Sequence, residues 1–394
     1  MAWQLYQGDA LETLKQMEDE SINCCVTSPP YWGLRDYGVD GQLGLEPTPD
    51  EYVAKMVEVF REVKRVLRND GTLWLNLGDS YVGSWGNYGG QKRGMGSQRK
   101  IISGSRIHQE AYDGLEKWRP PTSNKINNLK PKDLAGIPWR VAFALQADGW
   151  YLRSDIIWAK PNLMPESVTD RPTKAHEYIF LLSKSERYFY DAEAIKENSV
   201  DPQGSAARYK YTFSGRDGLI MPDGKPQQIA TKGIREFSSK RNKRTVWNIT
   251  TKPFSEAHFA TFPPEIPETC IKAGTSEKGC CPKCGSPWIR VIEKTGHINK
   301  REPAHVPNNC PTKTDNTGWA PTTRATDKWQ PICSCGIEET TSCTVLDPFA
   351  GAGTTLWVAE QLGINSIGIE INPEYCEIIR RRMAGLETNL FLTK

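Results

Sequence analysis

The stretch CTVLDPFAGAGTT, residues 343–355, decides the fold. An apolar run ends in Asp347 and enters a glycine-rich turn, after which a helix is expected over 354–362. Such a turn lets backbone approach a ligand that faces the helix N-terminus. A single GxG turn admits several nucleotide-like cofactors. Leu356 stands where a dinucleotide fingerprint has its third glycine, which disfavours a nicotinamide oxidoreductase.

A second strand is expected over 366–370, directly after that helix, and it ends in Glu370. A carboxylate at the carboxyl end of such a strand can accept hydrogen bonds from a ribose diol. A closing helix is expected over 373–386. The C-terminal region is therefore predicted to be a βαβ unit that holds a cofactor with a ribose.

The first half of the chain repeats the alternation of strand and helix. Strands are expected over 3–6, 22–27, 72–77, 151–158 and 177–183, and helices over 10–18, 51–67 (capped by Asp50 and ended by residues 69–71) and 137–148. This alternation predicts an α/β, Rossmann-like, doubly wound, mostly parallel sheet. The pattern lapses at about 83–131, where we predict a mobile insert, and again at about 201–252.

Composition limits the class of protein. The chain has 394 residues with 38% hydrophobic and 25% charged, which suits one large domain with inserts. No apolar run reaches the roughly 18 residues that span a bilayer, and no secretion signal is visible, so a cytoplasmic location is expected. The net charge of +3 decides little. Basic residues gather in 92–132 and 225–244, which favours contact with phosphates.

The motif TSPPYW, residues 27–32, suggests the chemistry. An exocyclic amine is a poor nucleophile because its lone pair is delocalised, and it needs acceptors that orient its N–H bonds. Ser28 Oγ and the carbonyl of Pro29 can accept these bonds, and Pro29 with Pro30 fixes the turn. Tyr31 offers a face on which an extruded base could stack. The alternative is a simple Pro-Pro turn that ends a strand.

Together, TSPPYW early and DPFAGAGTT late resemble the β group of DNA amino-methyltransferases. In that family the catalytic half precedes the half that binds S-adenosylmethionine (AdoMet), which is a permuted order of the class I methyltransferase fold. The resemblance implies AdoMet as the methyl donor and double-stranded DNA with a flipped base as the substrate. A cognate restriction endonuclease is an expected partner.

The resemblance also implies cofactor-binding residues. The methionine moiety would lie against Asp347, Phe349, Gly351, Gly353, Thr354 and Thr355, the ribose against Glu370 and Asn372, and the adenine against Asp9 and Ala10. The segment HFATFPP, residues 258–264, would close over AdoMet through Phe262 and Pro263. Asp9 could also be the N-cap of the following helix, and both roles can coexist.

The choice of base depends on Ser28. In this family serine at that position usually accompanies N4-cytosine methylation, and aspartate usually accompanies N6-adenine methylation. Ser28 therefore favours cytosine and leaves adenine as the alternative. Direct transfer needs no thiolate, so Cys24 and Cys25 are expected to be core residues. A remote alternative is a non-catalytic zinc and DNA-binding module that retains a degenerate methyltransferase domain.

Stretches around Trp158 and Lys160 and over 176–180 also resemble the surroundings of the family's target-base pocket. These side chains could equally be packing and surface residues.

Two cysteine pairs suggest a zinc knuckle. The candidate ligands are Cys281, Cys284, Cys333 and Cys335, with Cys280 and Cys310 as spares. A CxxC pair is typical of zinc sites, whereas the CxC pair is tighter than usual. The role would be structural, and reduced cysteines without a metal are the alternative.

The resulting division of the chain has five parts. We expect a catalytic half over 1–200, a target-recognition region over 201–255, the AdoMet-closing segment over 256–279, a candidate zinc-binding insert over 280–336 and the AdoMet-binding half over 337–394.

Overall fold

The computed structural model describes residues 3–34, 38–39, 41–82, 129–130, 132–163, 166–198, 240–252, 262–295 and 322–392. Almost all of the expected insert at 83–131, most of the expected recognition region, the residues His258–Thr261 and Cys310 lie outside these ranges. None of the helices within them is long and apolar enough to cross a membrane.

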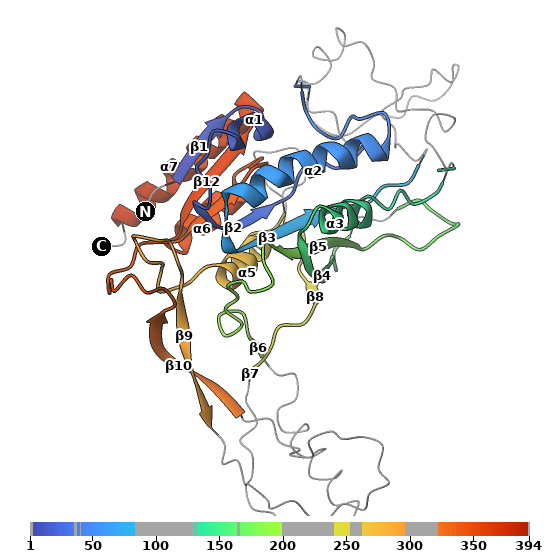
Figure 1. Ribbon diagram of the computed structural model, residues 1–394. Coiled ribbons are helices and arrows are strands. Elements are labelled where there is room, and N and C mark those ends of the chain that lie inside the picture. The colour runs from blue at the N-terminus through green and yellow to red at the C-terminus, as the bar shows by residue number, and fades with distance from the viewer. Residues whose placement is uncertain are drawn as a thin grey trace, which may run out of the picture.

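A central sheet carries the fold (Figure 1). The helices are α1 (Ala10–Leu14), α2 (Pro49–Val66), α3 (Ile137–Ala147), α5 (Glu265–Gly274), α6 (Thr354–Gln361) and α7 (Pro373–Leu392). The strands are β1 (Trp3–Gln7), β2 (Ile22–Thr27), β3 (Leu67–Leu77), β4 (Tyr151–Ala159), β5 (His176–Ser183), β6 (Glu197–Asn198), β7 (Lys240–Arg241), β8 (Val246–Asn248), β9 (Trp288–Thr295), β10 (Thr322–Pro331), β11 (Thr344–Asp347) and β12 (Asn365–Glu370).

The eight strands of the main sheet follow the order β1-β12-β11-β2-β3-β5-β4-β8. Only β5 runs antiparallel to both of its neighbours, and the other pairs are parallel. The predicted mostly parallel, doubly wound sheet is confirmed. Two short pairs, β9 with β10 and β6 with β7, lie outside it.

Alternating side chains of the sheet divide the core into two layers. On β2, Cys25 faces the cluster shared with α1, α2 and α3, whereas Cys24 and Val26 face the cluster shared with α5 and α6. The same alternation separates Leu73 from Trp74 on β3. Burial on both faces explains why β2 is mostly apolar rather than alternating.

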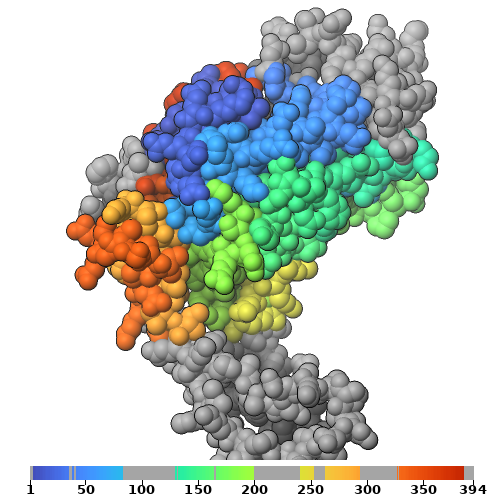
Figure 2. All heavy atoms as spheres, in the orientation of Figure 1, coloured from blue at the N-terminus to red at the C-terminus, as the bar shows by residue number. Residues whose placement is uncertain are grey.

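The two ends of the chain meet in the sheet. β1 pairs in parallel with β12, so that Trp3 lies opposite Ser366 and Gln7 opposite Glu370. Figure 2 shows the dark blue N-terminal residues against the red C-terminal ones at one end of the molecule. Residues 3–14, which we expected in the catalytic half, therefore lie in space beside β12, which we expected in the AdoMet-binding half.

The end of the expected recognition region also belongs to the main sheet. β8 pairs with β4 through Ile157 and Val246, and Trp247 is buried in the core cluster beneath the sheet. The boundary expected at 255 is therefore too late in the chain, since at least residues 246–248 are part of the main sheet.

Several expected boundaries are wrong for local reasons. α2 is capped by Thr48, whose Oγ1 accepts from the amide of Glu51 at 3.2 Å, rather than by Asp50. Pro49 suits the first helical position because its missing N–H has no partner there. Residues 69–71 lie inside β3, which begins directly after the helix. α7 continues to Leu392, beyond the expected end at 386.

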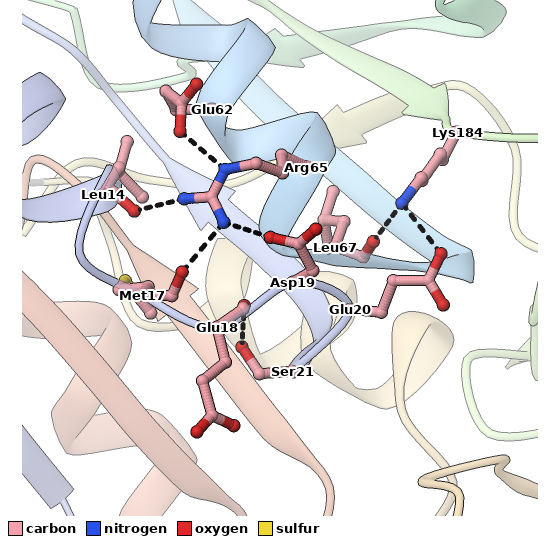
Figure 3. A network of polar contacts seen from close by, with 10 residues as sticks. All are labelled: Leu14, Met17, Glu18, Asp19, Glu20, Ser21, Glu62, Arg65, Leu67 and Lys184. Atoms are coloured by element: carbon pink, nitrogen blue, oxygen red, sulfur yellow. Dashed lines mark hydrogen bonds and ion pairs between the residues drawn. The ribbon is translucent and has the colours of Figure 1, made fainter.

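α1 ends at Leu14 instead of residue 18, and Arg65 of α2 explains this (Figure 3). Its guanidinium donates to the carbonyl oxygens of Leu14 at 2.6 Å and Met17 at 2.8 Å, and it pairs with Glu62 and Asp19. The carbonyls at the end of a helix are thereby satisfied, and the chain can turn into β2.

We predict that Arg65→Met lowers the free energy of unfolding by about 1–3 kcal/mol, because it removes the guanidinium that donates to two partly buried carbonyl groups. Urea denaturation followed by circular dichroism measures this. The matched control is Arg61→Met on the same helix, whose exposed guanidinium pairs with Asp148. It should cost less than about 1 kcal/mol. Equal losses in the two variants would contradict the role assigned to Arg65.

Candidate active site

A cavity of about 320 Å³ opens at the carboxyl ends of the parallel strands, where open α/β sheets bind ligands. Of the residues expected to bind the cofactor, this set lines it: Asp9, Ala10, Phe262, Phe349, Gly351, Thr354, Glu370 and Asn372. Ser28 and Pro30 of the TSPPYW motif line the same cavity. Two motifs more than 300 residues apart in the sequence thus share one cavity.

Asp347 and Thr355 lie behind the wall of the cavity. The Asp347 carboxylate is buried and accepts from Thr27 Oγ1 at 2.7 Å, Thr355 Oγ1 at 2.6 Å and the Phe349 amide at 3.1 Å. Burial raises the pKa of Asp347 to about 6. These hydrogen bonds join the end of β2 to the turn after β11, so both residues shape the glycine-rich turn from beneath.

The two glycines of the turn have different surroundings. Gly353 has φ of +73°, and a Cβ there would lie 2.9 Å from Ile379 Cγ1 of α7, so the position needs glycine for packing. Gly351 faces the cavity, and its amide donates to Glu370 Oε2 at 2.8 Å.

Glu370 is set at the mouth of the turn by backbone donors. Its Oε1 accepts from the Asn372 amide at 2.8 Å, and its Oε2 accepts from Gly351. Burial raises the pKa of Glu370 to about 7. Each oxygen keeps a lone pair for a further donor, so the carboxylate is both fixed in place and able to accept from a ligand.

Asp9 caps α1 and also lines the cavity. Its Oδ1 accepts from the Glu12 amide at 3.0 Å, which confirms the N-cap interpretation. One carboxylate oxygen is enough for the cap, so a contact with a ligand stays compatible with it. Of the two residues chosen from the expected closing segment, Phe262 lines the cavity and Pro263 does not. The helix α5, which follows them, packs in the core layer that contains Cys24 and Val26.

Tyr31 is held by a polar network. Ser28 Oγ donates to the Tyr31 hydroxyl at 3.3 Å, and that hydroxyl donates to Glu177 Oε2 at 2.7 Å. Asn76 Nδ2 donates to the same hydroxyl at 2.8 Å and to Ser28 Oγ at 3.3 Å. Lys160 forms an ion pair with Glu177. Tyr31, which was chosen from sequence for its ring, is therefore also joined through its hydroxyl group to Ser28, Asn76 and Glu177.

The position of the Tyr31 ring depends on a glycine. A Cβ at Gly78, just after β3, would lie 2.5 Å from Tyr31 Cε2. The tyrosine ring therefore occupies space that any other residue at position 78 would fill.

Sequence reasoning did not identify Asn76 and left Glu177 and Lys160 undecided. Asn76 is 3% exposed and interrupts the apolar strand Leu73–Leu77, which was the available signal. Lys160 lies 4.2 Å from the centre of the Trp158 ring, and Trp158 is buried. Trp158 is thus a packing residue, as one of the two interpretations held, whereas Lys160 reaches the network.

The two cysteines of β2 are core residues, as expected. Cys24 and Cys25 are buried, and burial raises the pKa of Cys24 to about 12, which makes its thiol a poor nucleophile. The sulfur atoms of Cys281, Cys284, Cys333 and Cys335 lie within 4.8 Å of one another. Cys280 points elsewhere, toward the carbonyl oxygens of Thr341 and Ser342.

Comparison with known proteins identifies the family. The sequence model of the family described as DNA methylase, N6_N4_Mtase, matches residues 22–281 and 337–381. The chain is 38% identical over 386 residues to the Type II methyltransferase M.Cfr9I of Citrobacter freundii, covering 98% of this chain and 89% of that protein.

It is also 37% identical over 380 residues to the Type II methyltransferase M.SmaI of Serratia marcescens, covering 95% and 89%. Among solved structures, a putative DNA modification methylase from Thermus thermophilus complexed with S-adenosyl-L-methionine matches with 18% identity and a TM-score of 0.45, covering 97% of this chain and 95% of that one. The chain therefore belongs to the DNA methylase family, the AdoMet-dependent N6-adenine and N4-cytosine DNA methyltransferases.

Proposed function

We propose that this protein methylates N4 of cytosine at a specific site in DNA, on a base flipped out of the duplex. The observation that carries the proposal is that the TSPPYW turn and the glycine-rich turn open on one cavity, through Ser28 and Pro30 on one side and Gly351 and Glu370 on the other. A methyl donor and an amine can meet there without a covalent enzyme intermediate.

AdoMet supplies an electrophilic sulfonium methyl group. Glu370 would accept from its ribose hydroxyls and Asp9 from its adenine amine, while the backbone at Gly351 and Thr354 would lie against the methionine moiety, with Phe349 and Phe262 as apolar walls. Asp347, Gly353 and Thr355 would act indirectly, by holding the turn. Ala10 and Asn372 also line the cavity, whereas the assignment of Pro263, which does not line it, rests on the family resemblance alone.

On the other side, Ser28 Oγ and the Pro29 carbonyl would accept the N–H bonds of the amine and turn its lone pair toward the methyl group. Forming the N–C bond while the C–S bond breaks leaves a proton on nitrogen. The hydrogen bonds from Ser28 to Tyr31 and from Tyr31 to Glu177 provide a path for it. We assign Asn76 and Lys160 to positioning Tyr31 and Glu177.

The choice of cytosine rests on serine rather than aspartate at position 28. A flipped base, a restriction endonuclease that cuts the same site, a target-recognition role for 201–245 and a cytoplasmic location complete the proposal. The names of the Type II relatives support the restriction-modification role.

The modified base tests the proposal directly. DNA from cells that express the protein is digested to nucleosides and analysed by mass spectrometry, and N4-methylcytosine is expected. N6-methyladenine in its place would overturn the choice of base, and 5-methylcytosine would overturn the mechanism.

Tyr31→Ala should lower kcat by about 10²-fold or more. Near-normal turnover in that variant would contradict the role of the tyrosine.

Gly78→Ala tests the placement of Tyr31 without altering the cavity lining. The added methyl group must displace the ring, so kcat/KM should fall by roughly 10- to 100-fold. The Kd for AdoMet, measured by calorimetry, should stay within about twofold. Gly385→Ala on α7, where a Cβ meets nothing within 4 Å, is the control and should retain full activity. Wild-type activity in Gly78→Ala would refute the argument.

The pH dependence of AdoMet binding tests Glu370. Hydroxyl donors favour the ionised carboxylate, whose pKa is about 7, so affinity should weaken as the pH falls through 7. Between pH 8 and pH 6 the ionised fraction drops about tenfold, and Kd should rise by a similar factor. Glu370→Gln should bind weakly with a flat profile. A wild-type profile as flat as that of the variant would exclude Glu370 as the acceptor.

A further inference from the structure

We propose that Cys281, Cys284, Cys333 and Cys335 bind one zinc ion, which fastens the open end of the β9–β10 hairpin to the amino edge of the main sheet. The inference is independent of the methylated base. It rests on how the hairpin places the cysteines, on the spacing of their sulfur atoms and on the contacts between this cluster and the sheet.

The hairpin brings together two pairs that are far apart in sequence. The strands β9 and β10 are antiparallel, and their last pair at the open end is Trp288 with Pro331. Cys281 and Cys284 come just before that pair, and Cys333 and Cys335 come just after it. The separation in sequence between the two cysteine pairs is therefore bridged by strand pairing, and the tight CxC spacing is no obstacle.

Both pairs lie in turns that aim the sulfur atoms inward. The Gly285 amide donates to the Cys281 carbonyl at 2.7 Å, and Gly285 has φ of +68°. Gly336, which follows Cys335, also has φ of +68°. A glycine with positive φ after each cysteine pair lets the chain turn back at once, which is how a zinc knuckle folds around its ion.

The spacing of the sulfur atoms fits a metal. All four lie within 4.8 Å of one another, and the cysteines are not joined as disulfides. Zinc–sulfur bonds of about 2.3 Å in a tetrahedron place neighbouring sulfur atoms about 3.8 Å apart. A contraction of about 1 Å at most therefore completes the site. Four sulfur ligands with no position for water are typical of structural zinc.

The knuckle is attached to the sheet by polar contacts. Arg68 of β3 donates to the Cys284 carbonyl and to Ser286 Oγ at 3.3 Å. Asn23 of β2 donates to the Gly285 carbonyl at 3.2 Å and accepts from the Thr344 amide at 2.9 Å. These residues lie at the amino ends of β2, β3 and β11, whereas the cofactor cavity lies at the carboxyl ends. The zinc would thus stabilise the fold and take no part in methyl transfer.

The hairpin is held at its base by Arg290, which pairs with Asp191 and Glu277, but its outer part is exposed. Its side chain Ile292 is 60% exposed, and Ile332 just beyond it is 50% exposed. Figure 2 shows the orange residues of this region at one margin of the molecule. Two-stranded ribbons are only marginally stable in water. A metal ion bound at the open end would therefore add to the stability of the hairpin.

Metal analysis of the purified full-length protein tests the site. Inductively coupled plasma mass spectrometry should find about one zinc per chain, and the double variant Cys333→Ser/Cys335→Ser should contain less than about one tenth of that. Cys280→Ser is the matched control, since this neighbour is outside the cluster and serine can keep its hydrogen bonds. It should retain the full zinc content. Wild-type protein without zinc, or with iron in its place, would overturn the proposal.

Cobalt substitution decides the matter if the double variant fails to fold. Wild-type protein loaded with Co²⁺ should show the intense thiolate-to-metal charge-transfer bands and visible bands of a tetrahedral tetrathiolate site. A spectrum of octahedral cobalt without thiolate bands would exclude the four-cysteine site.

Hydrogen exchange tests the structural role. Removing zinc with a chelator should speed amide exchange in 288–295 and 322–331 by at least about tenfold, while exchange in the β11–β12 turn and the Kd for AdoMet change by less than about twofold. Loss of AdoMet binding on zinc removal would show that the ion acts on the cofactor site and would contradict a purely structural role.

Discussion

The parallel pairing of β2 with β11 is the constraint on which the rest of the molecule depends. Cys24 lies opposite Val345 and Cys25 opposite Leu346, and just beyond these pairs Thr27 donates to the buried carboxylate of Asp347. This contact joins residues 320 positions apart. Because the TSPPYW turn follows one strand and the glycine-rich turn follows the other, the register of this one pair sets the distance between the two turns that line the cavity.

Local sequence signals predicted the elements and the motifs but not their partners. Local residues alone determine the conformation of the mostly apolar strand 22–27 and of the turn 347–355. Both were therefore placed correctly from the sequence. Glu177 carries no such signal. It reaches Tyr31 because β5 runs antiparallel to β3, with Tyr178 opposite Leu77. Register between distant strands comes from the packed sheet rather than from any local pattern.

Two expected helix boundaries are wrong, one because of a contact from another helix and one because two residues near the helix start can both act as caps. The end of α1 is set by Arg65, which comes much later in the sequence, and the start of α2 is set by a threonine at 48 whose neighbour Asp50 is also a good capping residue. The cysteine pairs left two alternatives open because strand pairing, and not their spacing in sequence, brings them together. Their spacing in sequence is unusual, and it becomes ordinary once the β9–β10 hairpin is formed.

The place of β1 beside β12 has a consequence for how the protein is made. The ribosome delivers β1 and β2 long before β11 and β12, yet in the sheet the two later strands lie between the two earlier ones. Until synthesis has passed Asp347, β2 is exposed along one edge, and until it has passed Glu370, β1 has no neighbour in the main sheet. The nascent chain therefore completes its central core only after β12 has been made, and the same event brings together the two turns that line the cavity.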